Sequence, residues 1–167
     1  MKPFEVLVQD HGAKVLRVCR SVAGFDDAED AWSETFISAL RAYPQLPADA
    51  NAEAWLVTIA HRRSIDLVRR RNRQPLPVDD PGETADRNGA GAPADADVAH
   101  GHDDLYAAMR DLPNKQRLAV AYHHLGGLAH REVAELLGGS EAAARRASAD
   151  GVAALRKTHL GRTCHER

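Results

Sequence analysis

Aromatic residues are scarce in this chain: its 167 residues include only three tyrosines, three phenylalanines and two tryptophans. The apolar residues are mainly alanine and leucine, which favour helices, and no alternating run of β-branched residues indicates a strand. Hydrophobic residues still make up 44% of the sequence, enough for the cores of one medium domain or two small ones. We therefore expect an all-α protein.

Cysteines and long apolar runs are also lacking. Cys19 and Cys164 are too few and too far apart in sequence to indicate a disulfide framework, so we expect free thiols. No stretch of about 18 uncharged apolar residues could span a bilayer, and the N-terminus lacks the pattern of a signal peptide. The sequence thus predicts a cytoplasmic location and no membrane insertion.

The motifs of common enzymes and metal sites are missing as well. The sequence has no glycine-rich phosphate loop, no nucleophile elbow and no HExxH pair. Its nine histidines do not show the paired spacing of a structural zinc site. We expect no enzymatic activity, no cofactor and no metal. A hydrolase built on histidines and aspartates from both halves of the chain is the rival from another class.

Charge is distributed unevenly along the chain. Residues 1–74 carry 11 basic and 10 acidic side chains, residues 75–104 carry one basic and eight acidic, and residues 105–167 carry ten basic and six acidic. The middle segment is rich in Pro, Gly, Ala and acidic residues and has almost nothing to bury, so we expect a flexible linker. Its length favours two helical domains over one.

The first lobe is expected to be a helical bundle. Residues 4–22 predict one helix that Gly24 ends, and a second helix follows with Asp26 or Asp27 as its N-cap. Pro44 stops that second helix. Its predicted buried face consists of Ala28, Trp32, Phe36, Ile37 and Leu40, and its outward, acidic face carries Asp27, Asp30, Ser33 and Glu34.

The stretch from Ala54 to Gln74 begins with mainly apolar residues and ends with mainly basic ones. Asp66 stands three or four residues from neighbouring arginines and can hold them by helical ion pairs, and Asn51 or Asp49 can cap the helix. An ordered basic face suits phosphate, although a solvated face on an ordinary helix explains the same charges. At the helical period, the apolar arc holds Trp55, Leu56, Ile59, Ala60 and Leu67, and the opposite arc holds Arg62, Asp66, Arg69 and Arg73.

Residues 105–162 predict a second helical lobe. Within it, HREVAELLG is followed by a GGS turn and a long helix with Ser140 as its N-cap. Two helices joined by such a turn form a helix-turn-helix, whose second helix lies in the major groove of DNA. Many helical hairpins share this turn, so the segment alone leaves DNA binding open. Gly151 beside Asp150 is expected to weaken the last helix and its attraction to phosphate.

Taken together, the motifs are more specific. The chain resembles the sigma factors of bacterial RNA polymerase, of the compact extracytoplasmic-function (ECF) type, in DAEDAWSETFISALRAY, AWLVTIAHRRSIDLVRRR, an acidic linker and LPNKQRLAVAYHHLGGLAHREVAELLGGSEAAARRASADGVAALR. The resemblance implies a region 2 domain over 1–74 that binds core polymerase and the minus-ten promoter element. It further implies a linker over 75–104 and a region 4 helix-turn-helix domain over 105–162 for the minus-thirty-five element. The implied partners are bacterial core RNA polymerase, promoter DNA and an anti-sigma factor.

The resemblance also implies site residues, which act by binding. Basic side chains would neutralise phosphates and release counterions, and a few at the recognition helix would select bases. Trp55 and His61 are candidates to stack on freed bases, although Trp55 is more simply explained as a core anchor. A stand-alone helix-turn-helix regulator is the alternative. The implied sets are Asp27, Asp30, Ser33 and Glu34 for polymerase; Trp55, His61, Arg62, Arg69, Arg70 and Arg73 for the minus-ten element; and Arg131, Ser140, Glu141, Arg145 and Arg146 for the minus-thirty-five element.

Overall fold

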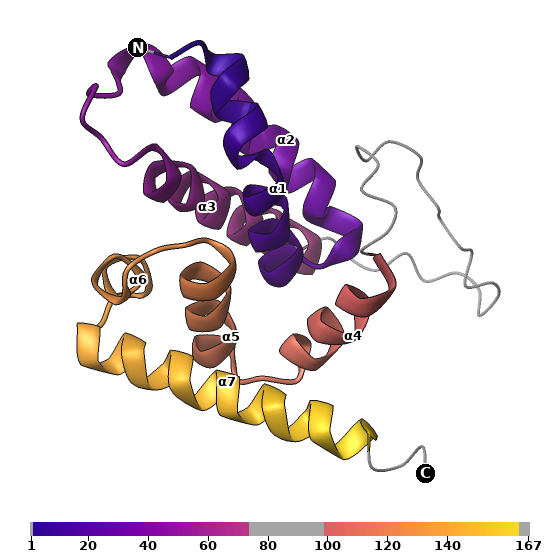
Figure 1. The fold of residues 1–167 in the computed structure, drawn as a ribbon. Helices are drawn as coiled ribbons and strands as arrows, with labels where there is room; N and C mark the ends of the chain where they lie inside the picture. Colours follow the sequence, from indigo (N-terminus) through magenta and orange to yellow (C-terminus); the bar gives the residue numbers. More distant parts are fainter. Residues whose placement is uncertain (1, 74–98, 164–167) are drawn as a thin grey trace, which may run out of the picture.

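The computed structural model describes residues 2–73 and 99–163, so the predicted linker lies outside the described residues from 75 to 98 (Figure 1). The described residues form helices and turns without a strand, which confirms the all-α prediction. The elements are α1 (Phe4–Ala23), α2 (Phe25–Ala42), a short 3-10 turn η1 (Tyr43–Gln45), α3 (Ala52–Arg73), α4 (Ala99–Arg110), α5 (Asn114–Val120), a π-helical turn η2 (Ala121–Leu125), α6 (His130–Leu137) and α7 (Glu141–Thr163).

Helices α1, α2 and α3 pack against one another as the N-terminal domain. Gly24 separates α1 from α2 with a φ of 84°, so the predicted end of the first helix is confirmed. Gly24 also occupies the N-cap of α2, and the predicted cap at Asp26 or Asp27 is wrong. Both aspartates lie in the first turn instead, where the helix dipole favours carboxylates without any capping bond.

The start of α3 agrees with the sequence. The Asn51 Oδ1 atom accepts a hydrogen bond from the Ala54 backbone N at 3.2 Å, which satisfies one of the free amides of the first turn. Asn51 is therefore the capping residue rather than Asp49. Before it, α2 ends at Ala42 and Pro44 lies in the 3-10 turn, as expected for a residue that cannot continue a helix.

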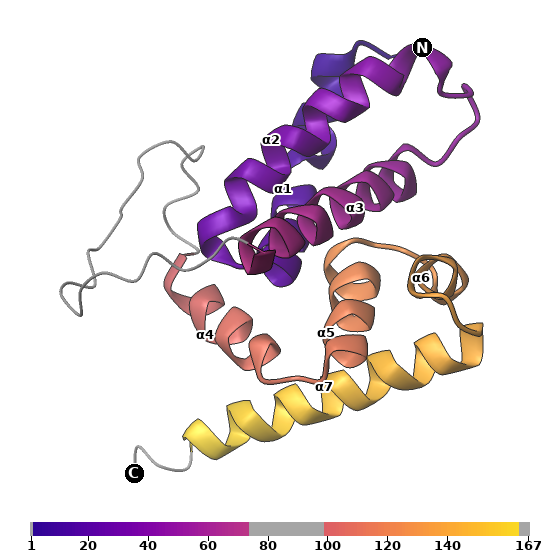
Figure 2. The same ribbon diagram turned by 180° about the vertical axis from the view of Figure 1, so that it is seen from behind.

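Helices α4 to α7 form the C-terminal domain, in which the long α7 packs against α5 and α6 (Figure 2). Helix α4 begins at Ala99, six residues before the predicted start at Leu105. The side chains of Tyr106 and Met109 in this helix are buried and hold it against the core. Because Ala99 also favours the helical conformation, the helix extends back into the predicted linker.

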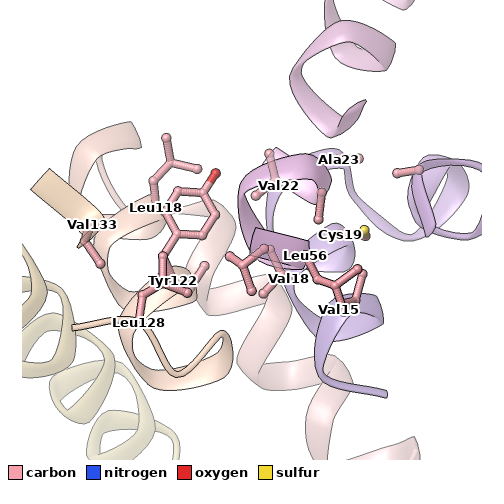
Figure 3. Packing of buried hydrophobic residues seen from close by; sticks show 14 of the residues in the cluster. Val15, Val18, Cys19, Val22, Ala23, Leu56, Leu118, Tyr122, Leu128 and Val133 are labelled. Carbon is pink, nitrogen blue, oxygen red and sulfur yellow. The ribbon is translucent and has the colours of Figure 1, made fainter. Parts of the chain in front are cut away.

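The two domains share one hydrophobic core. Helix α1 packs against η2 of the C-terminal domain, and Figure 3 shows Val18 and Leu56 facing Tyr122 and Leu118 across the junction. Leu56 and Tyr122 are fully buried. Because each such side chain contributes roughly 1.5–3 kcal/mol when buried, the contact stabilises a closed arrangement of the two domains.

Polar and aromatic contacts border this junction. Phe25 of α2 meets Tyr106 of α4 edge to face with ring centroids 5.2 Å apart. On another side, Gly127 has a φ of 75° and lies against the Lys14–Glu53 ion pair, whose Nζ and Oε2 atoms are 2.6 Å apart. A side chain at Gly127 would collide with the Glu53 carboxylate, so glycine permits both the turn and the close approach.

Candidate nucleic-acid interface

The basic end of α3 is braced by α2. Arg71 Nη1 lies 2.7 Å from the Asp27 carboxylate, and Arg70 Nη1 lies 3.7 Å from that of Glu34. The predicted ion pairs between Asp66 and neighbouring arginines are wrong: among the described residues, Asp66 has no arginine nitrogen within 4.0 Å. Of the arginines near Asp66, Arg70 binds a carboxylate of the facing helix instead, because α2 and α3 pack against each other.

Arg62, Arg69 and Arg73 remain exposed on α3. The only contact that the described residues give Arg73 is a hydrogen bond from its Nε to the Arg69 carbonyl oxygen, at 3.2 Å. These three arginines therefore form a surface that an anion can approach from solvent. The three were predicted for the minus-ten element, and the geometry leaves their charges available for phosphate.

The exposed face of α2 is partly apolar. Asp30 and Ser33 are exposed as predicted, but so are Ile37 (51%) and Leu40 (55%), which the sequence pattern placed in the core. The predicted Ala28 and Phe36 are buried, but the other buried positions of α2 belong to Ala31, Thr35 and Ala39. Helical periodicity missed this because the alanines and Thr35 permit close packing, and the large side chains then point outward.

Trp55 and His61 differ in their surroundings. Trp55 is half-buried and packs against the core, in agreement with its simpler interpretation. His61 instead hydrogen-bonds through its Nδ1 atom to the Tyr122 hydroxyl of the C-terminal domain, with the two rings edge to face at 5.2 Å. Burial, followed by the charges of Arg62 and Arg69, lowers the pKa of His61, which keeps the imidazole neutral and able to accept a hydrogen bond from the phenol.

The helix-turn-helix forms as predicted from α6, the GGS turn and α7. The Ser140 Oγ atom accepts a hydrogen bond from the Ala143 backbone N at 3.1 Å, so the predicted N-cap is confirmed. Two ion pairs lie nearby. Arg145 Nη2 is 2.6 Å from Glu141 Oε1, and Arg131 Nε is 3.4 Å from Glu135 Oε1. The five predicted residues lie exposed at this end of the domain. They are Arg131, Ser140, Glu141, Arg145 and Arg146.

Gly151 has a packing role that the sequence did not reveal. It is buried where α7 crosses α5, and a Cβ atom there would lie 2.6 Å from Val120 Cγ2. Helix α7 continues through this position to Thr163, so the predicted weakening does not interrupt it. The glycine lowers helix propensity but allows the two helices to approach closely.

Two further contacts were not predicted from the sequence. Tyr122 had no assigned role, although it is fully buried and holds His61. The histidines of the second lobe also lie close together, with the ring centroids of His123 and His130 stacked 3.8 Å apart.

Over the described ranges, no three His, Cys, Asp or Glu side chains are grouped to hold a metal ion. No helix in those ranges is long and apolar enough to cross a membrane.

These features define a two-domain, all-α protein with a braced basic helix in one domain and a helix-turn-helix in the other. Comparison with known families agrees with that description. A model of sigma-70 region 2 matches residues 7–74, and a model of sigma-70 region 4 matches residues 102–155. The chain belongs to the sigma-70 family and, by its relatives, to the ECF type.

Two curated relatives illustrate the likeness. The chain is 34% identical over 145 residues to the ECF RNA polymerase sigma factor SigE of Mycolicibacterium smegmatis, covering 83% of this chain and 54% of SigE. It is 29% identical over 140 residues to the ECF RNA polymerase sigma factor SigM of Mycobacterium tuberculosis, covering 83% of this chain and 67% of SigM. The chain thus spans about half the length of SigE.

Solved structures share the fold. CnrH, in complex with the cytosolic domain of CnrY, has a TM-score of 0.65 at 21% identity, covering 95% of this chain and 88% of CnrH. The sigma factor RpoE, in complex with the anti-sigma factor NepR from Bartonella quintana, has a TM-score of 0.66 at 20% identity. The match covers 92% of this chain and 96% of RpoE. At these identities the likeness concerns the fold alone.

Proposed function

We propose that this chain is a sigma factor that binds bacterial core RNA polymerase and directs promoter recognition, strand opening and transcription initiation. One observation carries the proposal: models of both sigma-70 regions match, in the family's order, the two domains whose surfaces bear the exposed arginines. The domain assignment is region 2 over 1–74, a linker over 75–104 and region 4 over 105–162. The role is one of binding in the cytoplasm, without bond chemistry or a cofactor.

The face of α2 is the proposed docking surface for core polymerase. Asp30 and Ser33 are exposed there, and Ile37 and Leu40 extend the surface with apolar area. An acidic and apolar face suits a partner that is basic at one end of the contact and apolar at the other. Asp27 and Glu34, also predicted for this contact, brace the arginines of α3 and so couple the docking face to the DNA-binding helix.

DNA would meet two surfaces. Arg62, Arg69, Arg70 and Arg73 of α3 are assigned to the minus-ten element, with Trp55 and His61 as the candidates to stack on freed bases. The start of α7 and the neighbouring Arg131 are assigned to the minus-thirty-five element. Phosphate contacts position such a protein and base-edge contacts give it sequence preference.

His61 is partly buried against Tyr122 in the closed arrangement, and we infer that the two domains separate before strand opening. The closed arrangement is then the resting form, and core polymerase draws the domains apart. An anti-sigma protein is the proposed regulatory partner, because a ligand that binds only the closed form would shift the population away from the DNA-binding one. A protein of that kind is bound to RpoE in the Bartonella quintana structure.

Co-migration separates this function from its alternative. A sigma factor should elute with core polymerase from a sizing column, whereas a stand-alone helix-turn-helix regulator should elute alone. Elution of the purified chain at its own size, with core polymerase in excess, would contradict the proposal.

A further inference from the structure

A hollow of about 340 Å³ lies beside the recognition helix. Its walls come from three elements: the π-helical turn η2, the start of α6 and the middle of α7. Small residues of α7 leave the space open, since Ala149 and Ala153 line it where larger side chains would fill it. The polar residues lining it are His123, His124, His130, Arg145, Ser148 and Arg156.

The histidines of this hollow are held in fixed positions. The rings of His123 and His130 are stacked, with centroids 3.8 Å apart and planes 20° from parallel. His123 donates from its Nδ1 atom to the Leu128 carbonyl oxygen at 2.7 Å, so in the neutral ring its Nε2 atom carries the lone pair. His124 Nε2 lies 3.2 Å from the Ser148 Oγ atom. The walls are therefore organised before any ligand arrives.

The electrostatics of the hollow favour an anion. Two guanidinium groups and three imidazoles line it, and none of its lining residues carries a carboxylate. Beside it, the Glu141 carboxylate is bound to Arg145 Nη2 at 2.6 Å, and the other nitrogens of that guanidinium can still donate. Arg156 is exposed on the next turns of the same helix.

One polar atom at the wall lacks a partner. The His130 Nδ1 atom is buried and makes no hydrogen bond to any described residue. Buried polar atoms are usually satisfied by protein, water or ligand. Because Nδ1 is shielded from solvent, an anionic oxygen in the hollow would have to meet this ring at its other nitrogen, Nε2.

We propose that this hollow binds a phosphate group of the duplex backbone next to the minus-thirty-five element, with Arg145 and Arg156 supplying fixed charge and His130 taking up a proton as the phosphate binds. The proposal rests on the proposed function, since it places DNA along α7. It assigns part of the affinity to histidines of η2 and α6, outside the recognition helix itself.

Affinity then depends on pH. Partial burial and the neighbouring His123 and Arg145 lower the pKa of His130, opposed by Glu141, and burial with His123 lowers the pKa of His124. These rings are therefore neutral at pH 7 in the free protein, and two stacked imidazoles resist a second charge. A phosphate beside them reverses that balance, so binding takes up protons and tightens as the pH falls, by about tenfold per pH unit for each proton.

The test uses the full-length protein and two probes, inorganic phosphate and a promoter duplex. Histidine ring signals are followed by NMR while each probe is added, and duplex affinity is measured by fluorescence anisotropy between pH 5.5 and 8. We expect the duplex to shift the His123 and His130 signals and the affinity to rise as the pH falls. Unmoved ring signals, or an affinity independent of pH, would overturn the proposal. Shifts with inorganic phosphate but not with the duplex would overturn the placement on DNA.

Variants identify the groups responsible. His123→Gln with His130→Gln should abolish most of the pH dependence, and His11→Gln on α1, outside the hollow, should retain it. Arg156→Gln tests the fixed charge at an exposed position that the fold does not need, and should weaken duplex binding several-fold at every pH. If the double variant unfolds, the Arg156→Gln result alone decides, and an unchanged affinity counts against the site.

A separate measurement keeps the two proposals distinct. Transcription by core polymerase with this chain depends on the proposed function and proceeds whether or not the hollow holds phosphate. Transcription together with an unchanged pH dependence in the histidine variants contradicts only the hollow. Absence of transcription at every pH contradicts the sigma-factor proposal itself.

Discussion

The imidazole of His61 and the phenol of Tyr122 hydrogen-bond across the junction of the two domains, 61 residues apart in sequence. His61 lies on the helix proposed to open the promoter, and Tyr122 belongs to the domain proposed to read the upstream element. This one contact therefore joins the two proposed DNA-binding surfaces. In the proposed function, this contact helps to hold the domains closed until another molecule separates them.

Replacing Tyr122 with Phe should weaken the closed form. The ring is retained, but the His61 Nδ1 atom loses its partner, which should lower the free energy of unfolding by about 1–3 kcal/mol. Urea denaturation measures the change. Tyr43→Phe is the matched control, because the Tyr43 hydroxyl donates to the Lys2 carbonyl oxygen at an exposed site. Equal losses in both variants would contradict a special role for the junction.

Stability should fall as the pH drops. The pKa of His61 is lowered in the folded protein, first by burial and then by Arg62 and Arg69, so the unfolded chain binds the proton more readily. The stabilisation is fully present above the unfolded pKa of about 6.5 and is lost as the pH falls toward the lower folded pKa. Unfolding free energies at pH 7.5 and 5.5 measure this slope.

The variant His61→Gln should show a smaller decrease between those two pH values. His124 and His130, whose pKa values are also lowered, contribute the remainder of the slope. An identical slope in the variant would mean that His61 does not become charged on unfolding in this range.

Gly151→Ala should destabilise the C-terminal domain although alanine favours helix by up to about 1 kcal/mol. The new methyl group would lie 2.6 Å from Val120 Cγ2 and 3.2 Å from the Gln116 carbonyl oxygen, so α5 and α7 must move apart. Overpacking of this kind costs about 1–3 kcal/mol. Gly139→Ala is the control, because nothing lies within 4 Å of its Cβ position. A stabilised Gly151→Ala protein in thermal unfolding would refute the packing role.

Reversing charge on α2 tests the proposed docking surface. Asp30→Arg with Glu34→Arg should weaken binding to core polymerase, by tenfold or more if both side chains face the partner, since tenfold corresponds to about 1.4 kcal/mol. Asp10→Arg on α1 serves as an exposed control. Affinity would be measured by titrating labelled chain with core polymerase. Equal affinities for the docking variant and the control would remove the assignment from α2.

The sequence was informative where local chemistry decides structure. Capping by Asn51 and Ser140 and the helix end at Gly24 follow from short-range hydrogen bonds and backbone preferences, and all three predictions are confirmed. The family was recognisable for a similar reason, because its motifs lie in order within two continuous segments.

Contacts between elements could not be read in this way. The partners of Arg70 and Arg71 lie on another helix, and for Arg70 the sequence indicated Asp66 as a nearer partner. Ile37 and Leu40 fit a buried helical stripe, but the small residues of α2 allow closer packing. The pairing of His61 with Tyr122 depends on how two domains meet, and no periodicity encodes that geometry.

Transcription from a promoter library by core polymerase, with and without this chain, tests the central claim most directly. We predict that adding the chain selects a subset of promoters sharing minus-ten and minus-thirty-five elements, and that core polymerase alone initiates at none of them. If the transcripts are the same with and without the purified chain, it is not a sigma factor.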